Sequence, residues 1–455
     1  MGEGVLRVEP GRLDGLTAGT SREGELFSDA GLSRDESGVL RLGRVSVEEI
    51  AREAGTPAYV YNAESIRRRY EALTAAMGTL PHRIHYAVKA NSCLAVMRVL
   101  RDLGAGCDIV SGGELHLSRA AGFTPDRLVF SGVGKTAAEL SLAFEAGIGQ
   151  INIESLEELT LLADLASRRT GAGPVRVGIR VNPDVTVDTH PYITTGTAAA
   201  KFGIPADQVL DAARRIAGDP HLLLSGIAMH VGSQLLETEP YSTGAARLAE
   251  LVGTIRGAGI TTLESIGIGG GLGIRYKDEV PLDPWDLAVA IGPIIAPLGL
   301  AVHLEPGRFL VGSAGVLLTT VLYRKQAGGK HFVVVDAGMT DLVRPSRYNA
   351  HHEMVVARDR GRALRHVDVV GPICESGDFL ALDRPMPLVE PGDVIAILGA
   401  GAYGFVMSST YNARPRPPEL LVDGSKWAVA RPRETLDDLI RGERPDCFGG
   451  AAAPS

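Results

Sequence analysis

The sequence predicts an α/β protein with a second, all-β part: a (β/α)8 barrel of the TIM type followed by a C-terminal β domain. Between about residues 83 and 304, short apolar runs alternate with helical patterns, which is typical of a parallel sheet closed into a barrel. After about residue 315 strand patterns follow one another, separated by glycine and proline. The length of 455 residues suits a large barrel with one further domain.

Eight strand patterns make up the expected barrel, with helical patterns such as 138–146 and 156–169 between them. We expect the barrel strands at residues 83–88, 107–110, 128–130, 150–153, 175–181, 225–230, 263–268 and 301–304. The strands expected in the β domain are 316–323, 331–336, 366–370, 393–398 and 419–422.

The N-terminal region is expected to contribute to the β domain. The strand-like stretch 39–42 would pair with it, which makes that domain discontinuous. The sequence from Ser46 to Glu49 is a capping box that opens a short helix ending near Gly55. We therefore divide the chain into four segments. Residues 1–55 form an arm that is loose up to residue 35 and then joins the β domain. Residues 56–315 form the barrel, residues 316–445 form a β-sandwich or β-barrel domain, and residues 446–455 form a disordered tail.

Composition excludes several classes of function. A net charge of -8 gives no indication of nucleic-acid binding. The longest apolar stretch, residues 289–302, is short and broken by Pro293 and Pro297, so a membrane span is not expected. The adjacent His351 and His352 lack a third ligand at a suitable spacing, so no metal site is expected. The four cysteines show no paired spacing, which indicates a reducing cytoplasm; they are Cys93, Cys107, Cys374 and Cys447.

Polar residues gather where the expected barrel strands end. In such barrels the chemistry takes place at the C-terminal ends of the strands, and the loops after strands seven and eight often bind phosphate. A single residue at a strand end has little weight, but most of the eight strands have one. These residues are Lys89, Asp108, Glu154, Arg180, Asn182, His230, Gly269-Gly270-Gly271 and Glu305 to Arg308.

One motif points elsewhere. Residues 130–136 resemble a nucleotide-binding P-loop that ends in Gly134-Lys135-Thr136. The P-loop motif requires a glycine five positions before Gly134, and Val129 stands there. We therefore do not expect ATP binding at this loop.

The combined motifs resemble one family closely. From about residue 38 to 442 the chain is similar to the diaminopimelate decarboxylases, pyridoxal-phosphate (PLP) enzymes of fold type III. In the barrel the matching strings are 86–91, 230–234, 269–274 and 305–308, several of which other decarboxylases share. The more specific strings lie in the β domain and are 344–348, with Arg344 and Tyr348, and Cys374-Glu375-Ser376; the strings 336–339 and 401–404 also match.

The resemblance implies a role for each matching residue toward the cofactor. Lys89 would hold PLP through its amine, His230 would lie against the ring face, and Glu305 would pair with the ring nitrogen. Backbone N–H groups of the glycine triplet would approach the phosphate closely. The remaining expected cofactor-binding residues are Asp108, Ser233, Gly307, Arg308 and Tyr403.

The resemblance also implies how the substrate binds. Planar guanidinium groups suit a carboxylate far from the reacting carbon, and a glutamate suits a distal ammonium group. Cys374 would donate the proton to the carbon that loses carbon dioxide, reaching the cofactor from a neighbouring subunit. A homodimer with shared active sites is therefore implied. The expected substrate-binding residues are Arg308, Arg344, Tyr348, Glu375 and Tyr403.

The activity implied by the resemblance is a carboxy-lyase reaction: meso-2,6-diaminopimelate loses carbon dioxide at its D-centre and gives L-lysine, the last step of lysine biosynthesis. Three alternatives stay open. One is a related decarboxylase that acts on carboxynorspermidine, another basic amino acid or a carrier-bound amino acid. A racemase on the same barrel is disfavoured by Cys374-Glu375-Ser376, and a homologue without catalysis is disfavoured by intact Lys89 and Cys374.

Overall fold

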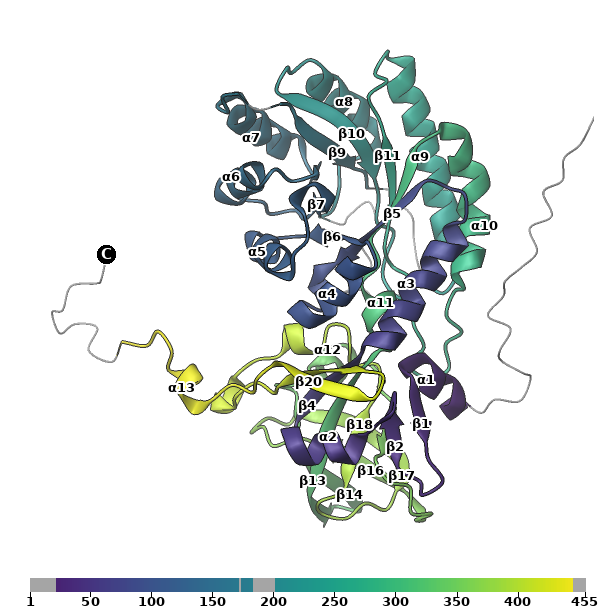
Figure 1. Ribbon diagram of the computed structural model, residues 1–455, viewed down its shortest axis with the longest axis vertical. Coiled ribbons are helices and arrows are strands. Elements are labelled where there is room, and N and C mark those ends of the chain that lie inside the picture. Colours follow the sequence, from purple (N-terminus) through teal and green to yellow (C-terminus); the bar gives the residue numbers. More distant parts are fainter. Residues whose placement is uncertain (1–21, 172, 183–200, 445–455) are drawn as a thin grey trace, which may run out of the picture.

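A computed structural model describes residues 22–171, 173–182 and 201–444 of the chain. The molecule has two parts, a barrel wrapped by helices and a β domain at one end of it (Figure 1). Residues 1–21 of the expected arm, the expected tail 446–455 and Cys447 lie outside the described residues. In the described ranges, none of the helices has the length and apolar character needed to span a bilayer.

The predicted barrel is confirmed. Its eight strands are parallel and follow chain order, and the last pairs with the first to close the ring. Each expected strand is present, with ends shifted by no more than three residues. The strands are β5 (His82–Ala87), β6 (Gly106–Ile109), β7 (Leu128–Phe130), β8 (Gln150–Ile153), β9 (Val175–Arg180), β10 (Leu222–Ala228), β11 (Ser265–Gly269) and β12 (Ala301–Leu304).

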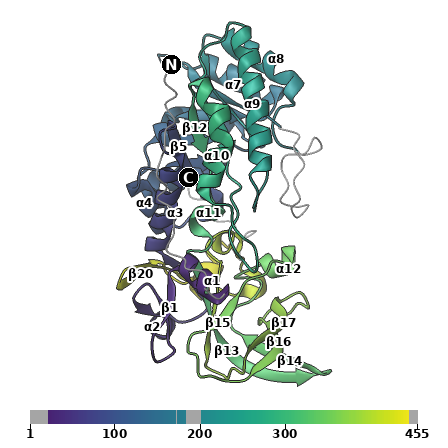
Figure 2. The same cartoon turned by 90° about the vertical axis from the view of Figure 1, so that its right-hand side faces the viewer.

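Helices connect the barrel strands and cover the outside of the barrel (Figure 2). Their sequences explain their placement: α8 buries Val209, Ala212, Ala213 and Ile216, an i, i+3, i+4, i+7 stripe that faces the sheet. The connecting helices are α4 (Leu94–Asp102), α5 (Gly112–Ala121), α6 (Ala137–Ala146), α7 (Leu156–Ser167), α8 (Val209–Ala217), α9 (Glu239–Gly257) and α10 (Pro284–Ile295).

Three consecutive barrel helices begin in the same way. In α5, α6 and α7 a serine or threonine caps the helix by accepting a hydrogen bond from the backbone N–H of a glutamate three positions later. The glutamate side chains then lie near the loops at the C-terminal ends of the strands. The pairs are Ser111 with Glu114, Thr136 with Glu139, and Ser155 with Glu158.

The β domain is mainly one sheet in the order β17-β16-β14-β13-β4-β19-β20, with β18 and β15 branching from β13. The five expected strands are present as β13 (Gly315–Ala327), β14 (Lys330–Val335), β16 (Leu364–Val370), β18 (Val394–Ile397) and β19 (Glu419–Asp423). The sequence patterns missed β15 (Met354–Val356), β17 (Phe379–Pro387) and β20 (Lys426–Arg431). β17 mixes buried and exposed residues without regular alternation, and β20 has no fully buried residue.

One strand crosses from the barrel part of the sequence into the β domain. β4 (Ala58–Asn62) precedes α3 (Ala63–Met77) and lies inside the stretch expected to be barrel. It pairs instead with β13 and β19, at the centre of the other sheet. All five residues of β4 are buried, so the strand shows no alternation of buried and exposed residues.

The N-terminal segment packs on the β domain, as predicted. Leu40 in β2 (Leu40–Leu42) shares an apolar cluster with Val316 and Leu318, and its N–H donates to the carbonyl of Ala357. Ser46 caps α2 (Val47–Ala54) by accepting from the N–H of Glu49. The expectation of a loose arm up to residue 35 is wrong for the described part, because 22–30 form α1 and 32–34 form β1. The β2 strand also pairs with β1 and with β3 (Val45–Ser46).

The β domain meets the barrel at the C-terminal ends of the barrel strands. The N–H of Tyr403 donates to the carbonyl of Ala90 at 2.8 Å, and the Asn91 side chain donates to the carbonyl of Gly401 at 3.0 Å. Both bonds lie next to the turn that follows β5. They fix the loop around residue 403 of the β domain against the end of the barrel where polar residues gather.

Candidate active site

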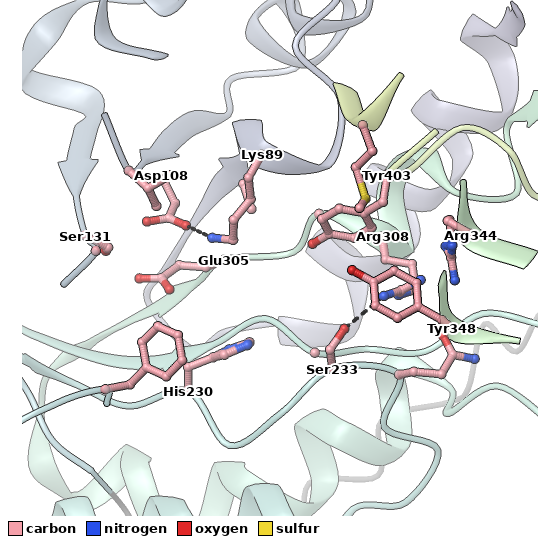
Figure 3. Close-up of a pocket in the computed structure, with 18 of the residues that line it drawn as sticks. Lys89, Asp108, Ser131, His230, Ser233, Glu305, Arg308, Arg344, Tyr348 and Tyr403 are labelled. Carbon is pink, nitrogen blue, oxygen red and sulfur yellow. Dashed lines mark hydrogen bonds and ion pairs between the residues drawn. The ribbon is translucent and has the colours of Figure 1, made fainter. Parts of the chain in front are cut away.

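A cavity of about 800 Å³ lies between the barrel strand ends and the β domain. It contains most of the polar residues predicted from the sequence. Barrel residues in its wall include Lys89, Asp108, His230, Ser233, Gly271, Glu305, Gly307 and Arg308, and the β domain contributes Arg344, Tyr348 and Tyr403. Figure 3 shows Lys89, Asp108, Glu305 and His230 on one side of this cavity, with Arg308, Arg344, Tyr348 and Tyr403 on the other.

Lys89 sits on a short 3-10 turn, Val88–Ala90, directly after β5. Its ammonium group donates a hydrogen bond to the Asp108 carboxylate of the neighbouring strand β6, with 2.6 Å between Nζ and Oδ2. Burial is the largest single effect and lowers the Lys89 pKa, but Asp108, Tyr403 and Glu305 together outweigh it, and the net pKa is raised. Asp108 is fully buried, and its second oxygen has no partner among the described residues. The cavity thus contains a charged amine beside a carboxylate with one unused oxygen.

Glu305 follows β12 and faces the same side of the cavity (Figure 3). Burial raises its pKa well above the usual range for a glutamate, and the nearby Asp108 carboxylate raises it further. Two carboxylates in one enclosed site resist being charged together. Glu305 is therefore able to hold a proton that a cationic or basic partner could share.

His230 follows β10 and is held as a neutral ring. Its Nδ1 accepts the N–H of Gly270 at 3.2 Å, which leaves any ring proton on Nε2. Burial lowers the pKa of His230 to about 3, and the cations Arg180 and Lys89 act in the same direction. An uncharged aromatic ring therefore faces the cavity.

The glycine triplet after β11 permits close contact between strand ends. A side chain at Gly270 would place its Cβ 2.2 Å from the carbonyl oxygen of Glu305, and one at Gly271 would place it 2.5 Å from that of Gly232. Gly271 also has a positive φ of 99°, which favours glycine. Of the three, only Gly271 is among the residues that line the cavity; Gly269 and Gly270 lie behind it.

The two predicted arginines lie side by side and share one partner that the sequence analysis missed. Nη1 of Arg308 donates to the Tyr276 hydroxyl at 2.6 Å, and Nη1 of Arg344 donates to the same oxygen at 2.8 Å. Nη2 of Arg308 also donates to Ser233 at 3.1 Å. Both guanidinium groups are buried, and both Nε atoms have no partner among the described residues. The Arg308 group also lies over the ring of Tyr403, 5.0 Å from its centre.

A buried ion network supports the cavity wall beside β7 and β8. Lys135 has no exposed side-chain surface and donates to the carbonyls of Gly132 and Asn152, both at 2.7 Å, and to Glu158 at 2.6 Å. Its amine therefore faces the protein interior. This arrangement agrees with the exclusion of a nucleotide P-loop at residues 130–136. The structure assigns Lys135 to holding the loop that carries Gly132 against β8.

Glu154 and Arg180 continue this network at the next strands. Glu154 accepts the N–H of Gly132 at 2.8 Å and Arg180 at 2.7 Å through one oxygen, and the N–H of Gly203 through the other. The Arg180 guanidinium lies over the ring of Phe202. The sequence indicated Glu154 and Arg180 by their strand-end positions, and of these two Arg180 lines the cavity. Nothing in the sequence indicated the lining residues Ser131, Asn152 and Phe202.

Besides Gly269 and Gly270, two other predicted residues do not line this cavity. Cys374 and Glu375 lie on an exposed loop of the β domain. The N–H of Cys374 donates to the side chain of Asn412 at 2.8 Å, which ties the loop to the segment after residue 410. Within one described chain, the Cys374 thiol therefore lies on the outer surface, whereas the Lys89 amine lies in the cavity.

Comparisons with known proteins agree with this architecture. The family model described as the pyridoxal binding domain of pyridoxal-dependent decarboxylases matches residues 63–312. The diaminopimelate decarboxylase of Pseudomonas aeruginosa is 47% identical over 399 residues, 88% of this chain and 95% of the relative. That of Pseudomonas fluorescens is 44% identical, covering 93% of this chain and 97% of the relative.

Solved structures give the same result. The diaminopimelate decarboxylase of Helicobacter pylori, complexed with L-lysine, matches with a TM-score of 0.83 and 38% identity over 87% of this chain and 98% of that chain. The enzyme of M. jannaschii matches with a TM-score of 0.87 and 33% identity over 93% of this chain and 100% of that chain. The chain belongs to the diaminopimelate decarboxylase family of pyridoxal-dependent decarboxylases.

Proposed function

We propose that this chain removes carbon dioxide from meso-2,6-diaminopimelate at its D-centre and leaves L-lysine, as the last step of lysine biosynthesis. One observation carries the proposal. The same cavity holds an amine with two carboxylates, formed by Lys89, Asp108 and Glu305, and two buried arginines, Arg308 and Arg344. The first set suits amino-acid chemistry on a carbonyl cofactor, and the second suits a carboxylate at the far end of the substrate.

The residues present fit pyridoxal 5'-phosphate, the cofactor of this family. Lys89 ends in a primary amine within the cavity, and Asp108 keeps a buried oxygen with no partner among the described residues. Gly271 and Gly307 keep part of the wall free of side chains. When bound, the cofactor takes up the electron pair that the substrate carbon keeps as carbon dioxide leaves.

Each residue around the Lys89 amine has a defined task in this proposal. Lys89 would hold the cofactor through its amine, which must be deprotonated to act as a nucleophile. The raised pKa of Glu305 lets this residue share a proton with the ring nitrogen. The neutral ring of His230 would lie against the cofactor ring without adding charge. Ser233, Tyr403 and the backbone of Gly271, which lines the cavity, are assigned to the phosphate.

The opposite side of the cavity is assigned to the distal end of the substrate. Arg308 and Arg344 offer forked donors to the distal carboxylate, and Tyr348 and Tyr403 lie beside them (Figure 3). A substrate without a distal carboxylate would leave two buried guanidinium charges without an anionic partner, which is costly. This cost favours diaminopimelate over ornithine and lysine.

We further propose a homodimer in which each subunit completes the other's active site. Cys374 and Glu375 carry the expected proton-donating and ammonium-binding groups, yet they lie on an exposed loop away from the cavity wall. A second copy of the chain would bring this loop to the cavity. A cytoplasmic location is also proposed, because Cys93, Cys107 and Cys374 are all free thiols.

Carbon dioxide release from a panel of amino acids tests the proposed reaction. Purified protein with pyridoxal 5'-phosphate is given meso-diaminopimelate, L,L-diaminopimelate, lysine and ornithine in separate reactions. We expect release from the meso isomer alone, with lysine as the product. A bound cofactor without turnover of the meso isomer would contradict the proposed substrate and favour one of the related decarboxylases.

A further inference from the structure

Tyr276 is the residue on which the two buried arginines converge. It lies in the loop between β11 and α10, and its ring lines the cavity. The phenol oxygen accepts from Arg308 at 2.6 Å and from Arg344 at 2.8 Å. Both guanidinium carbons also lie near the ring, with Arg344 4.9 Å and Arg308 5.8 Å from its centre. The arginines therefore have the positions they occupy partly because of this one side chain.

The hydrogen-bond count at Tyr276 leaves its own hydrogen available. A phenol oxygen has one hydrogen to donate and accepts through its lone pairs. Two arginine donors already occupy the accepting side, and arginine cannot accept a hydrogen bond. Among the described residues, no acceptor receives the Tyr276 hydrogen. A buried donor needs a partner, and the cavity is where a ligand could supply one.

We propose that Tyr276 is a third ligand of the distal carboxylate of the substrate, donating its hydroxyl hydrogen while it holds Arg308 and Arg344 in place. This inference rests on the proposed function, since it assumes a substrate with a carboxylate at that end. The carboxylate then meets three donors that are positioned before it arrives. A preorganised site of this kind loses less entropy on binding than one whose side chains must be ordered.

The surroundings of Tyr276 fix its ring. His352 packs edge-on against it, with ring centres 5.3 Å apart and planes at 77°. Gly399 borders the ring closely: a Cβ there would lie 3.2 Å from two ring carbons. The backbone N–H groups of Tyr276 and Lys277 both donate to one carboxylate oxygen of Glu279, which fixes the turn of the loop. The hydroxyl is thus directed by packing and by the loop as well as by the arginines.

The charges around Tyr276 strengthen it as a donor to an anion. Burial raises the pKa of the phenol, but Arg308 and Arg344 outweigh burial, and the net pKa is lowered. A phenol with a lowered pKa donates a stronger hydrogen bond to a carboxylate. His352 adds no charge, because burial and the nearby Arg344 lower its pKa to about 3. The site therefore combines two fixed cations with a strengthened neutral donor.

Tyr276→Phe tests the proposal, because it removes the hydroxyl and keeps the ring beside both arginines. We expect the KM for meso-diaminopimelate to rise roughly 10- to 100-fold, the usual effect of losing a hydrogen bond to a charged group. The kcat and the affinity for pyridoxal 5'-phosphate should change far less. Tyr61→Phe is the matched control: it deletes another buried hydroxyl, which donates to Glu419 at 2.7 Å outside the cavity, and should leave KM unchanged.

Two inhibitors separate carboxylate binding from general damage. Lysine retains the distal carboxylate, whereas cadaverine has the same amines without it. In Tyr276→Phe the inhibition constant of lysine should rise by the same factor as KM, and that of cadaverine should stay unchanged. Equal weakening of both inhibitors, or no weakening of either, would overturn the inference.

Failure of the proposed function would give a different result. If the wild-type protein does not turn over meso-diaminopimelate, the proposed reaction is wrong. Binding of lysine and cadaverine, measured by calorimetry on the PLP-loaded protein, would still report on Tyr276. Selective loss of lysine binding in Tyr276→Phe would then support its role as a carboxylate ligand independently of turnover, and unchanged lysine binding would refute it.

Discussion

Replacing Arg344 with alanine should weaken substrate binding far more than cofactor binding. Arg344 comes from the β domain, is buried, and uses Nη1 to reach Tyr276, while its Nε has no partner among the described residues. The side chain lies across the cavity from Lys89 (Figure 3). Its loss should therefore act on the distal carboxylate and leave the amine and carboxylates that face the cofactor intact.

The expected loss of substrate affinity follows from the burial of the pair that Arg344 would form with the distal carboxylate. Truncating one partner of a buried, hydrogen-bonded charge pair costs about 2–5 kcal/mol. Arg308 remains at the site and still meets the carboxylate, so the lower part of that range applies. A loss of about 2.7 kcal/mol corresponds to an increase of about 100-fold in KM. Since the contact is present in both the ground state and the transition state, kcat should change little.

Steady-state kinetics on meso-diaminopimelate and titration with pyridoxal 5'-phosphate measure the two effects separately. Arg358→Ala serves as the control, because it removes an arginine of the same domain that pairs with Glu48 outside the cavity. We expect the control to retain wild-type kinetics. An equal loss of substrate and cofactor affinity in Arg344→Ala would refute the reasoning and indicate that Arg344 is structural.

Three further predictions concern other parts of the molecule. Cys374→Ala should keep the cofactor and lower kcat by about 10²–10⁴-fold. Mixing this variant with Lys89→Ala should restore about a quarter of wild-type activity, because hybrid dimers have one intact site. No recovery on mixing would exclude shared sites. Lys135→Met should lower the free energy of unfolding by about 3–5 kcal/mol, because it leaves a buried carboxylate unpaired; a change below 1 kcal/mol in denaturant titration would contradict the buried pair. Burial lowers the pKa of His85 to about 4 from 6.5, so the free energy of unfolding should fall by about 3 kcal/mol as the pH drops through this range. Chemical unfolding at several pH values should show a smaller decrease for His85→Asn, whereas the exposed control His366→Asn should behave like the wild type.

The barrel and most of the cavity wall could be predicted from the sequence for a physical reason. Parallel strands buried on both faces read as short apolar runs, and their C-terminal ends meet at one face of the barrel. Lys89, His230 and Glu305 follow such runs and Asp108 lies near the end of one, so their proximity follows from topology. The chain-order closure of β12 on β5 then brings Glu305 to the same side as Lys89 and Asp108.

Other features depend on tertiary contacts that the sequence does not display. Tyr276 lies in an irregular loop, and its role comes from two arginines 32 and 68 positions further along the chain. Lys135 lies in a string that resembles a phosphate loop, and only its buried carbonyl and carboxylate partners show an interior position. β4 reads as part of the barrel by its place in the chain, although it pairs in the other sheet.

The central claim is that the cavity binds the carboxylate at one end of the substrate while the carboxylate at the other end leaves as carbon dioxide. Labelling the two carboxyl groups of meso-diaminopimelate separately tests this claim directly. The account predicts that label in the carboxyl group of the D-centre leaves entirely as carbon dioxide and that label in the carboxyl group of the L-centre stays in lysine. Label at the L-centre released as carbon dioxide, or carbon dioxide without an equal amount of lysine, would contradict it.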